Sequence, residues 1–141
     1  MSLELYVISP RRLQSIQEWQ DAVDKCGFPI KFQPDTDFSK VSGFLPLQLR
    51  DRLSGFECSH WPIDDILKTY EGIKIDSSFK HALAFRWGGN YDELISATQA
   101  SAAYSVATEG LVFDCQEGDF ISNEKSIEIA RTIEEQVKSW L

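Results

Sequence analysis

The sequence predicts a single α+β domain, with a mixed β-sheet of about five or six strands and about four helices packed against it. A chain of 141 residues is the size of one ordinary domain. Amphipathic segments of helical period alternate with short β-rich runs along its whole length. Because neither a linker nor a repeat divides the sequence, we expect residues 1–141 to form one unit.

The first strand and the first helix are predicted before Gly27. Leu3–Ile8 is β-rich and reads as a strand. Ser9 followed by Pro10 predicts the start of a helix, since the hydroxyl can accept an amide hydrogen bond and proline suits the first helical position. Apolar residues then recur at helical spacing up to Gly27, a typical helix stop: Leu13, Ile16, Trp19, Val23 and Cys26.

Three strands are expected in the next part of the chain. Ile30–Phe32 alternates like a short strand. Phe44–Arg50 and Gly55–His60 read as a pair of strands joined by a turn at Asp51–Ser54. Pro46 has no amide hydrogen to give to a neighbouring strand, so its strand is expected at an edge or at a bulge.

A short helix and a central strand follow. Pro62–Glu71 predicts a helix that ends near Gly72, with four apolar side chains turned inward: Ile63, Ile66, Leu67 and Tyr70. His81–Trp87 is a mostly apolar run of strand length, which favours a central position in the sheet.

The C-terminal third is predicted to hold two long helices with a hairpin between them. Asn90, with Glu93 three residues later, predicts the start of an alanine-rich helix that runs to about Thr108 and ends at Gly110. Two short strands, at 111–113 and 120–121, flank a turn at 114–119. A final helix is expected from about Asn123 to Trp140, with this buried stripe: Ile127, Ala130, Ile133, Val137, Trp140 and Leu141.

Composition limits the class of protein. With 43% hydrophobic and 26% charged residues the chain reads as a soluble globular protein. Neither an apolar run of about 20 residues nor a signal-peptide pattern is present, so we expect a cytoplasmic location. Cys26, Cys58 and Cys115 are an odd number of cysteines without close spacing, which predicts reduced thiols.

The negative charge lies mainly in the C-terminal third. Residues 92–141 hold 3 basic and 10 acidic residues, a net of −7 out of the −8 of the whole chain. This balance argues against nucleic acids and anionic membranes as partners, and it would attract a basic protein. The alternative interpretation is that an acidic surface only keeps the protein soluble.

Residues able to carry catalysis or bind metal are few. Cys58, His60, His81 and Cys115 lack the usual zinc-ligand spacings, and neighbouring acidic residues disfavour a reactive Cys115. Adjacent carboxylates on a helix diverge too far to share a proton. Gly88-Gly89 lacks the fuller phosphate-loop patterns. We therefore predict no catalytic residue, no metal and no cofactor.

Two segments carry a resemblance to a known class of proteins. The first joins Gly43–Pro46 to Ser54–Glu57, and the second joins Ala82–Trp87 to Thr108–Asp114 through the alanine-rich helix. Together they resemble the small acidic immunity proteins of bacterial polymorphic toxin systems, which are encoded beside secreted toxins. The resemblance implies a non-enzymatic protein that binds one partner and occludes it. On this hypothesis the candidate contacts, chosen for charge density, are Glu109, Asp114, Glu117 and Asp119.

Two other functions remain open at this stage. Aromatic residues interleave with basic residues in the middle of the chain, a composition that also suits a ligand site. An enzyme or small-molecule-binding protein would have its pocket near Arg86, Trp87 and Tyr91. A structural subunit of a homo-oligomer is the third hypothesis, and the oligomeric state is left open.

Overall fold

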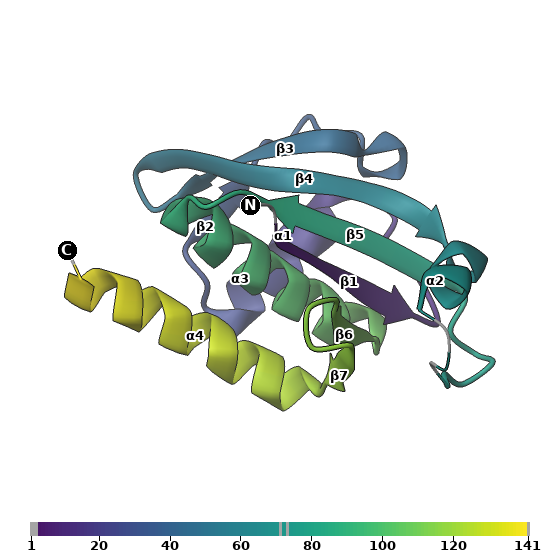
Figure 1. The fold of residues 1–141 in the computed structure, drawn as a ribbon. Helices are drawn as coiled ribbons and strands as arrows, with labels where there is room; N and C mark the ends of the chain where they lie inside the picture. Colours follow the sequence, from purple (N-terminus) through teal and green to yellow (C-terminus); the bar gives the residue numbers. More distant parts are fainter. Residues whose placement is uncertain (1–2, 71, 73, 141) are drawn as a thin grey trace.

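The fold is one antiparallel sheet with helices on both of its faces (Figure 1). The computed structural model describes residues 3–70, 72 and 74–140, with only the backbone described at 139–140. The elements in chain order are β1 (Leu3–Ser9), α1 (Ile16–Cys26), β2 (Ile30–Phe32), the 3₁₀ turn η1 (Phe38–Lys40), β3 (Ser42–Leu49), β4 (Arg52–Pro62), α2 (Ile63–Thr69), β5 (His81–Trp87), α3 (Tyr91–Thr108), β6 (Leu111–Asp114), β7 (Asp119–Ile121) and α4 (Asn123–Trp140).

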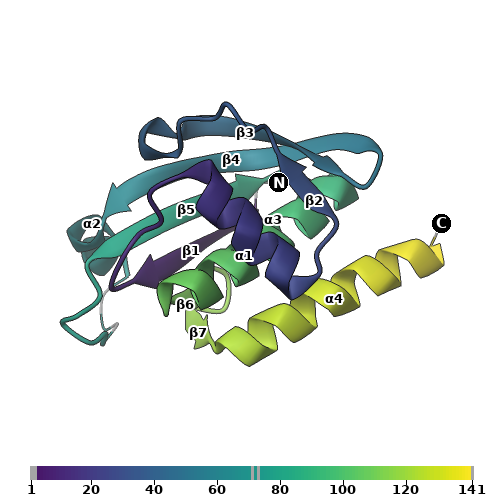
Figure 2. The same ribbon diagram turned by 180° about the vertical axis from the view of Figure 1, so that it is seen from behind.

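This architecture confirms the predicted α+β domain and its four helices. The sheet has seven strands where five or six were expected, in the order β2-β3-β4-β5-β1-β6-β7. Every neighbouring pair is antiparallel, so the sheet is not mixed. The first strand of the chain lies between β5 and β6, where it is paired on both sides. Helices α1, α3 and α4 cover one face (Figure 2), and α2 lies against the other.

Trp19 of α1 is the centre of the main core. Its side chain is fully buried, and its indole Nε1 donates a hydrogen bond of 3.0 Å to the Ala100 carbonyl of α3. Its ring contacts aromatic rings from five other elements: Phe32, Phe38, Phe56, Phe85 and Tyr104. Edge-to-face and tilted contacts of this kind add to the stabilisation from burial. One side chain therefore joins α1 to the sheet and to α3.

Small side chains place α3 at the centre of the helical layer. Its buried positions include Ala97, Ala100, Ala102 and Ala103, which let the backbone come close to its neighbours. The helix packs against α1, α4 and the sheet, as both views show. The left-handed residue at its C-terminus is Glu109, with φ of 58°, and not Gly110. The bounds predicted for α3 and α4 are confirmed, although the Trp140 side chain and Leu141 lie outside the described residues.

The first helix begins later than predicted. Ser9 stays in β1, opposite His81 of β5, so Ser9-Pro10 ends a strand and does not start a helix. The N-terminal cap is Ser15, whose side chain accepts a hydrogen bond from the Glu18 amide. Glu18 in turn accepts a bond of 3.1 Å from the Gln14 amide. The pair Ser15 and Glu18 has the spacing of a capping box, which was the better sequence signal.

The β3–β4 hairpin is tighter than predicted. Leu49 pairs with Arg52, so the turn is Arg50-Asp51 and the predicted turn at 51–54 is wrong. Arg50 takes the positive φ of 59° that this short connection requires. β3 lies between β2 and β4, so it is not the edge strand that Pro46 predicted. At the proline itself, however, β3 is unpaired on one side, because β2 pairs with it only through Leu47–Leu49 and stops before Pro46.

A second, smaller core lies on the other face of the sheet, beneath α2. It contains Tyr6 and Ile8 of β1, Ile66 of α2, Ala82 and Ala84 of β5, and Phe113 of β6. The predicted helix at 62–71 is found as Ile63–Thr69, with Ile66 buried as expected, while Glu71 lies outside the described residues. This core covers only the part of the face near the C-terminal end of β1.

Candidate functional site

No helix of the described residues lies over the remaining part of this face, which is formed mainly by β3 and β4. We call it the open sheet face. Side chains alternate between the two faces along a strand. Leu45, Leu47, Phe56 and Cys58 point into the main core, so their neighbours in sequence point outward onto the open sheet face. Its outward residues are Glu4, Phe44, Pro46, Gln48, Leu53, Glu57, Ser59, Trp61 and Arg86.

Large apolar side chains are exposed on this face. Phe44 is 59% exposed, Leu53 84% and Trp61 45%. The Trp61 indole donates a hydrogen bond of 2.8 Å to the hydroxyl of Ser59, two residues earlier on β4. Phe44 lies over Gly55, where a Cβ atom would come within 2.5 Å of the Phe44 ring and of the Leu45 carbonyl. The Phe44 ring thus packs against the backbone at Gly55, and the Trp61 indole is hydrogen-bonded to Ser59.

A row of charged residues crosses the same face. The strand register aligns Phe44 with Glu57, Glu57 with Arg86, and Arg86 with Glu4. Arg86 Nη2 lies 3.3 Å from Glu4 Oε2, and the Tyr6 hydroxyl donates a bond of 2.7 Å to Glu4 Oε1. One guanidinium therefore lies between two carboxylates, and the row has a net negative charge.

A shallow recess lies beside this row. Its volume is about 250 Å³, and its lining includes four small residues on three strands: Ser42, Gly43, Ser59 and Ala84. Trp61, Glu57 and Arg86 also line it. A recess lined by small residues, one indole and carboxylates can accept one apolar or basic side chain from another protein.

The structure brings three of the four predicted acidic contacts together. Asp114 and Asp119 pair across the β6–β7 hairpin, and Glu117 lies in its turn. One Asp114 oxygen accepts hydrogen bonds from the amides of Gln116 (2.9 Å) and Glu117 (3.4 Å), so it holds the turn. Glu109 lies at the other end of β6, after α3, and is not part of this group. We call Asp114, Glu117 and Asp119 the acidic hairpin.

The structure brings two of the three residues of the predicted ligand pocket to one recess. Arg86 and Trp87 are consecutive in β5, and their side chains point to the open sheet face and to the helical side, but both line a recess of about 270 Å³ together with Phe44, Glu57, Gly88 and Glu93. Tyr91 does not line this recess and is 52% exposed at the start of α3. In β3, Phe44 points to the face opposite to Leu45, Leu47 and Leu49. This alternation, together with the pairing of β3 with β4, was the sequence signal for the open sheet face.

The cysteine and histidine residues do not form one cluster. Cys58 and His60 both lie on the helical side of β4, whereas Cys115 packs beside the second core on the other side of the sheet. Burial raises the pKa of Cys115 to about 11 and also raises the pKa of Cys26. Within the described ranges, no group of three or more His, Cys, Asp or Glu residues is placed to hold a metal ion.

No family model, curated protein or solved structure matches the chain. Among the helices of the described residues, none has both the length and the apolar character needed to cross a membrane. The function must therefore be inferred from the side chains of the chain itself.

Proposed function

We propose that this chain is a protein-binding module that docks a basic protein partner on its open sheet face. The observation that carries the proposal is the exposure of Phe44, Leu53 and Trp61 on one face of one hairpin. Clustered apolar side chains on a protein surface mark interaction sites, whereas singly scattered ones do not. The role of an immunity protein, which the sequence resemblance implies, is one form of this function.

The composition of the face fits the centre of a protein–protein interface. Tryptophan and arginine are enriched among the residues that dominate binding energy, and Trp61 and Arg86 both border the recess. The neighbouring side chains are smaller or polar and can exclude water around these anchors. A flat sheet face also needs little rearrangement to bind, which lowers the entropic cost of association.

Charge favours a basic partner over an acidic one. The net charge of the chain is −8, and the open sheet face places Glu4 and Glu57 on both sides of Arg86. A lysine or arginine of the partner would meet a carboxylate and the face of Phe44 in the same place. The acidic hairpin and the overall negative field would speed the encounter, an effect that weakens as salt screens it.

The proposal is tested by photo-crosslinking in a lysate of the native cells. A benzoylphenylalanine at position 44 is expected to capture one basic protein, and the same group at Val106, exposed on α3, is expected to capture little of it. The double variant Phe44→Ala/Trp61→Ala should weaken capture about tenfold or more, because central aromatic anchors carry most of the binding energy.

Val106→Ala is the matched control, since it also shortens an exposed apolar side chain but lies on another surface. All variants are first compared by circular dichroism and thermal melting. Equal capture from positions 44 and 106 would contradict the proposal. So would an acidic partner, or full binding by the double variant.

A further inference from the structure

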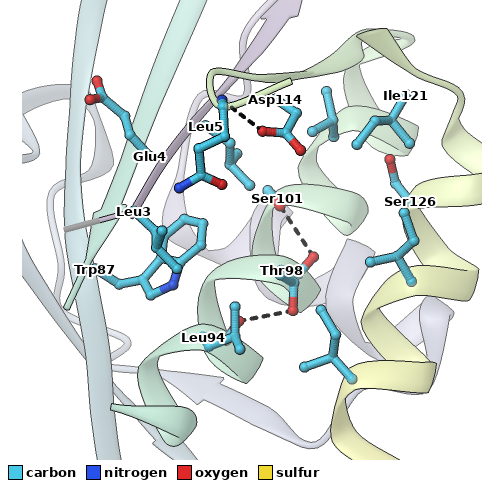
Figure 3. A pocket seen from close by; sticks show the side chains of 14 residues that line it. Leu3, Glu4, Leu5, Trp87, Leu94, Thr98, Ser101, Asp114, Ile121 and Ser126 are labelled. Atoms are coloured by element: carbon cyan, nitrogen blue, oxygen red, sulfur yellow. Dashed lines mark hydrogen bonds between the residues drawn. The ribbon is translucent and has the colours of Figure 1, made fainter. Parts of the chain in front are cut away.

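A cavity of about 210 Å³ lies on the helical side of the sheet, away from the open sheet face. Figure 3 shows Leu3 and Trp87 on its sheet side, Thr98 of α3 at its base and Ser126 of α4 on the opposite side. Half of its lining residues are aliphatic, and Leu5, Leu94, Val112, Ile121, Ile129 and Ile133 complete the apolar wall. Asp114 and Gln116 lie at the edge near the β6–β7 hairpin.

The short strands at this edge of the sheet explain why the space is open. β6 pairs with β1 only from Leu5 to Ile8, so Leu3 and Glu4 extend beyond the end of β6. β7 is three residues long and reaches no further than Asp119, the partner of Asp114. Side chains of α3 and α4 therefore face the first residues of β1 across a gap that no strand fills.

Two buried polar atoms in this lining have no hydrogen-bond partner among the described residues. The Trp87 side chain is 7% exposed and Ser126 is 6% exposed, yet Trp87 Nε1 and Ser126 Oγ are both unpaired. The other hydroxyls of the cavity are paired within α3, since Thr98 donates to the Leu94 carbonyl at 2.9 Å and Ser101 to the Thr98 carbonyl at 3.1 Å. Leaving a buried donor unpaired is unfavourable, so these two atoms indicate a missing partner.

We infer that this cavity is a binding site for a small uncharged molecule with an apolar ring or branched chain and one hydroxyl group. An indole N–H is only a donor, so Trp87 requires an acceptor atom from the ligand. The hydroxyl of Ser126 can donate or accept, and a ligand hydroxyl can do both. The volume is close to that of a cavity that holds benzene, which limits the ligand to about one ring.

Charge at the edge of the cavity disfavours anions. Asp114 lies at this edge, and no lysine, arginine or histidine is among the lining residues. Glu4 also borders the cavity, but its carboxylate lies on the outer face, where it contacts Arg86 and Tyr6. An anion of the same size would lose its hydration and meet the negative charge of Asp114. The site therefore discriminates against carboxylic acids and in favour of alcohols and phenols. This inference does not depend on the proposed protein partner, whose surface lies on the other side of the sheet.

The test compares phenol, toluene and benzoate, which share a ring and differ in the polar group. Titrations of the full chain are followed by ¹⁵N-resolved NMR of the tryptophan indole N–H groups. Phenol is expected to shift the Trp87 indole resonance, assigned by its loss in Trp87→Phe, and to bind about three- to tenfold more tightly than toluene. Benzoate is expected to bind more weakly than both.

Trp87→Phe keeps an aromatic ring in the cavity, removes the donor and makes the cavity somewhat larger, a change in volume that affects phenol and toluene alike. In this variant the affinity for phenol should fall to that for toluene, while toluene binding persists and shows that the cavity is intact. Three results would overturn the inference: no shift of the Trp87 indole with millimolar phenol, equal affinities for phenol and toluene, or an unchanged phenol affinity in Trp87→Phe.

Discussion

Gly110 shows how a single residue sets the distance between two elements. A Cβ atom at this position would lie 2.5 Å from the Ile8 carbonyl of β1 and 2.9 Å from the Ser9 Cβ. Because the nearest atom belongs to the backbone of a central strand, it cannot move aside as a side chain can. The glycine therefore allows the chain to pass from α3 into β6 directly beside β1.

Gly110→Ala is expected to destabilise the protein by about 1–3 kcal/mol, the usual cost of forcing extra volume into a packed site. Gly89→Ala is the control, since a Cβ atom at that position meets nothing within 4 Å and its φ is not positive. Urea denaturation followed by tryptophan fluorescence measures both variants. Equal midpoints for the two would contradict the close approach of Gly110 to β1.

Side-chain caps fix where the helices begin. Asn90 accepts hydrogen bonds from the amides of Asp92 (2.8 Å) and Glu93 (3.2 Å), which pairs two amides of the first turn of α3. Asp92 also holds Arg52 of the β3–β4 hairpin through two contacts of 2.9 and 3.0 Å. The start of α3 is therefore fixed by its own cap and by a charged pair with the hairpin.

Asn90→Ala is expected to lower the free energy of unfolding by about 1 kcal/mol, whereas Asn90→Ser should lose much less because serine also caps helices well. Amide hydrogen exchange is the more specific measurement. In the alanine variant, amide exchange should speed up most at the start of α3. The amides around Trp19 in the core should exchange faster only by the amount that the loss of global stability requires. Uniform acceleration over the whole chain would argue against a local cap.

At the scale of the whole molecule, two histidines tie stability to pH. His60 packs edge-to-face on Phe38, and its Nε2 lies 2.9 Å from the Phe38 carbonyl and 3.3 Å from Arg12 Nη2. Burial and the nearby Arg12 lower the pKa of His60 and also that of His81 below the usual 6.5, although the Phe38 carbonyl opposes this for His60. Between the lowered pKa of each histidine and the usual value of 6.5, the unfolded chain binds more protons than the folded one.

The free energy of unfolding should therefore decrease as the pH falls from about 7 to 5. Protonation of carboxylates reduces the repulsion within a chain of net charge −8, which acts in the opposite direction over part of this range. The double variant His60→Gln/His81→Gln separates the two effects. Urea midpoints at pH 7.5, 6.5 and 5.5 should decline less in the variant than in the wild type. Parallel declines would exclude the histidines as the cause.

The sequence alone determined most of the secondary structure and the fold class. Strand β5 and helices α3 and α4 were predicted within a residue. β5 is an apolar run of strand length, α3 begins at the Asn90 cap, and α4 has a clear helical period. Boundary errors arose at Ser9-Pro10 and at the β3–β4 turn. Ser9 is held in β1 by pairing with His81, far away in the chain. Residues 52–54 are held in β4 by pairing with β3 directly across a tight turn.

The functional surfaces depended on tertiary structure. Composition gave the net negative charge, and local sequence placed Asp114, Glu117 and Asp119 in one hairpin. Only the strand order placed Phe44, Glu57, Arg86 and Glu4 in one row, and only packing left Trp87 Nε1 and Ser126 Oγ unpaired around one cavity. Periodicity is a property of neighbours in sequence, so it predicts which way a side chain points within its element. What that side chain meets depends on long-range pairing and on how far each strand extends, which neighbouring residues do not encode.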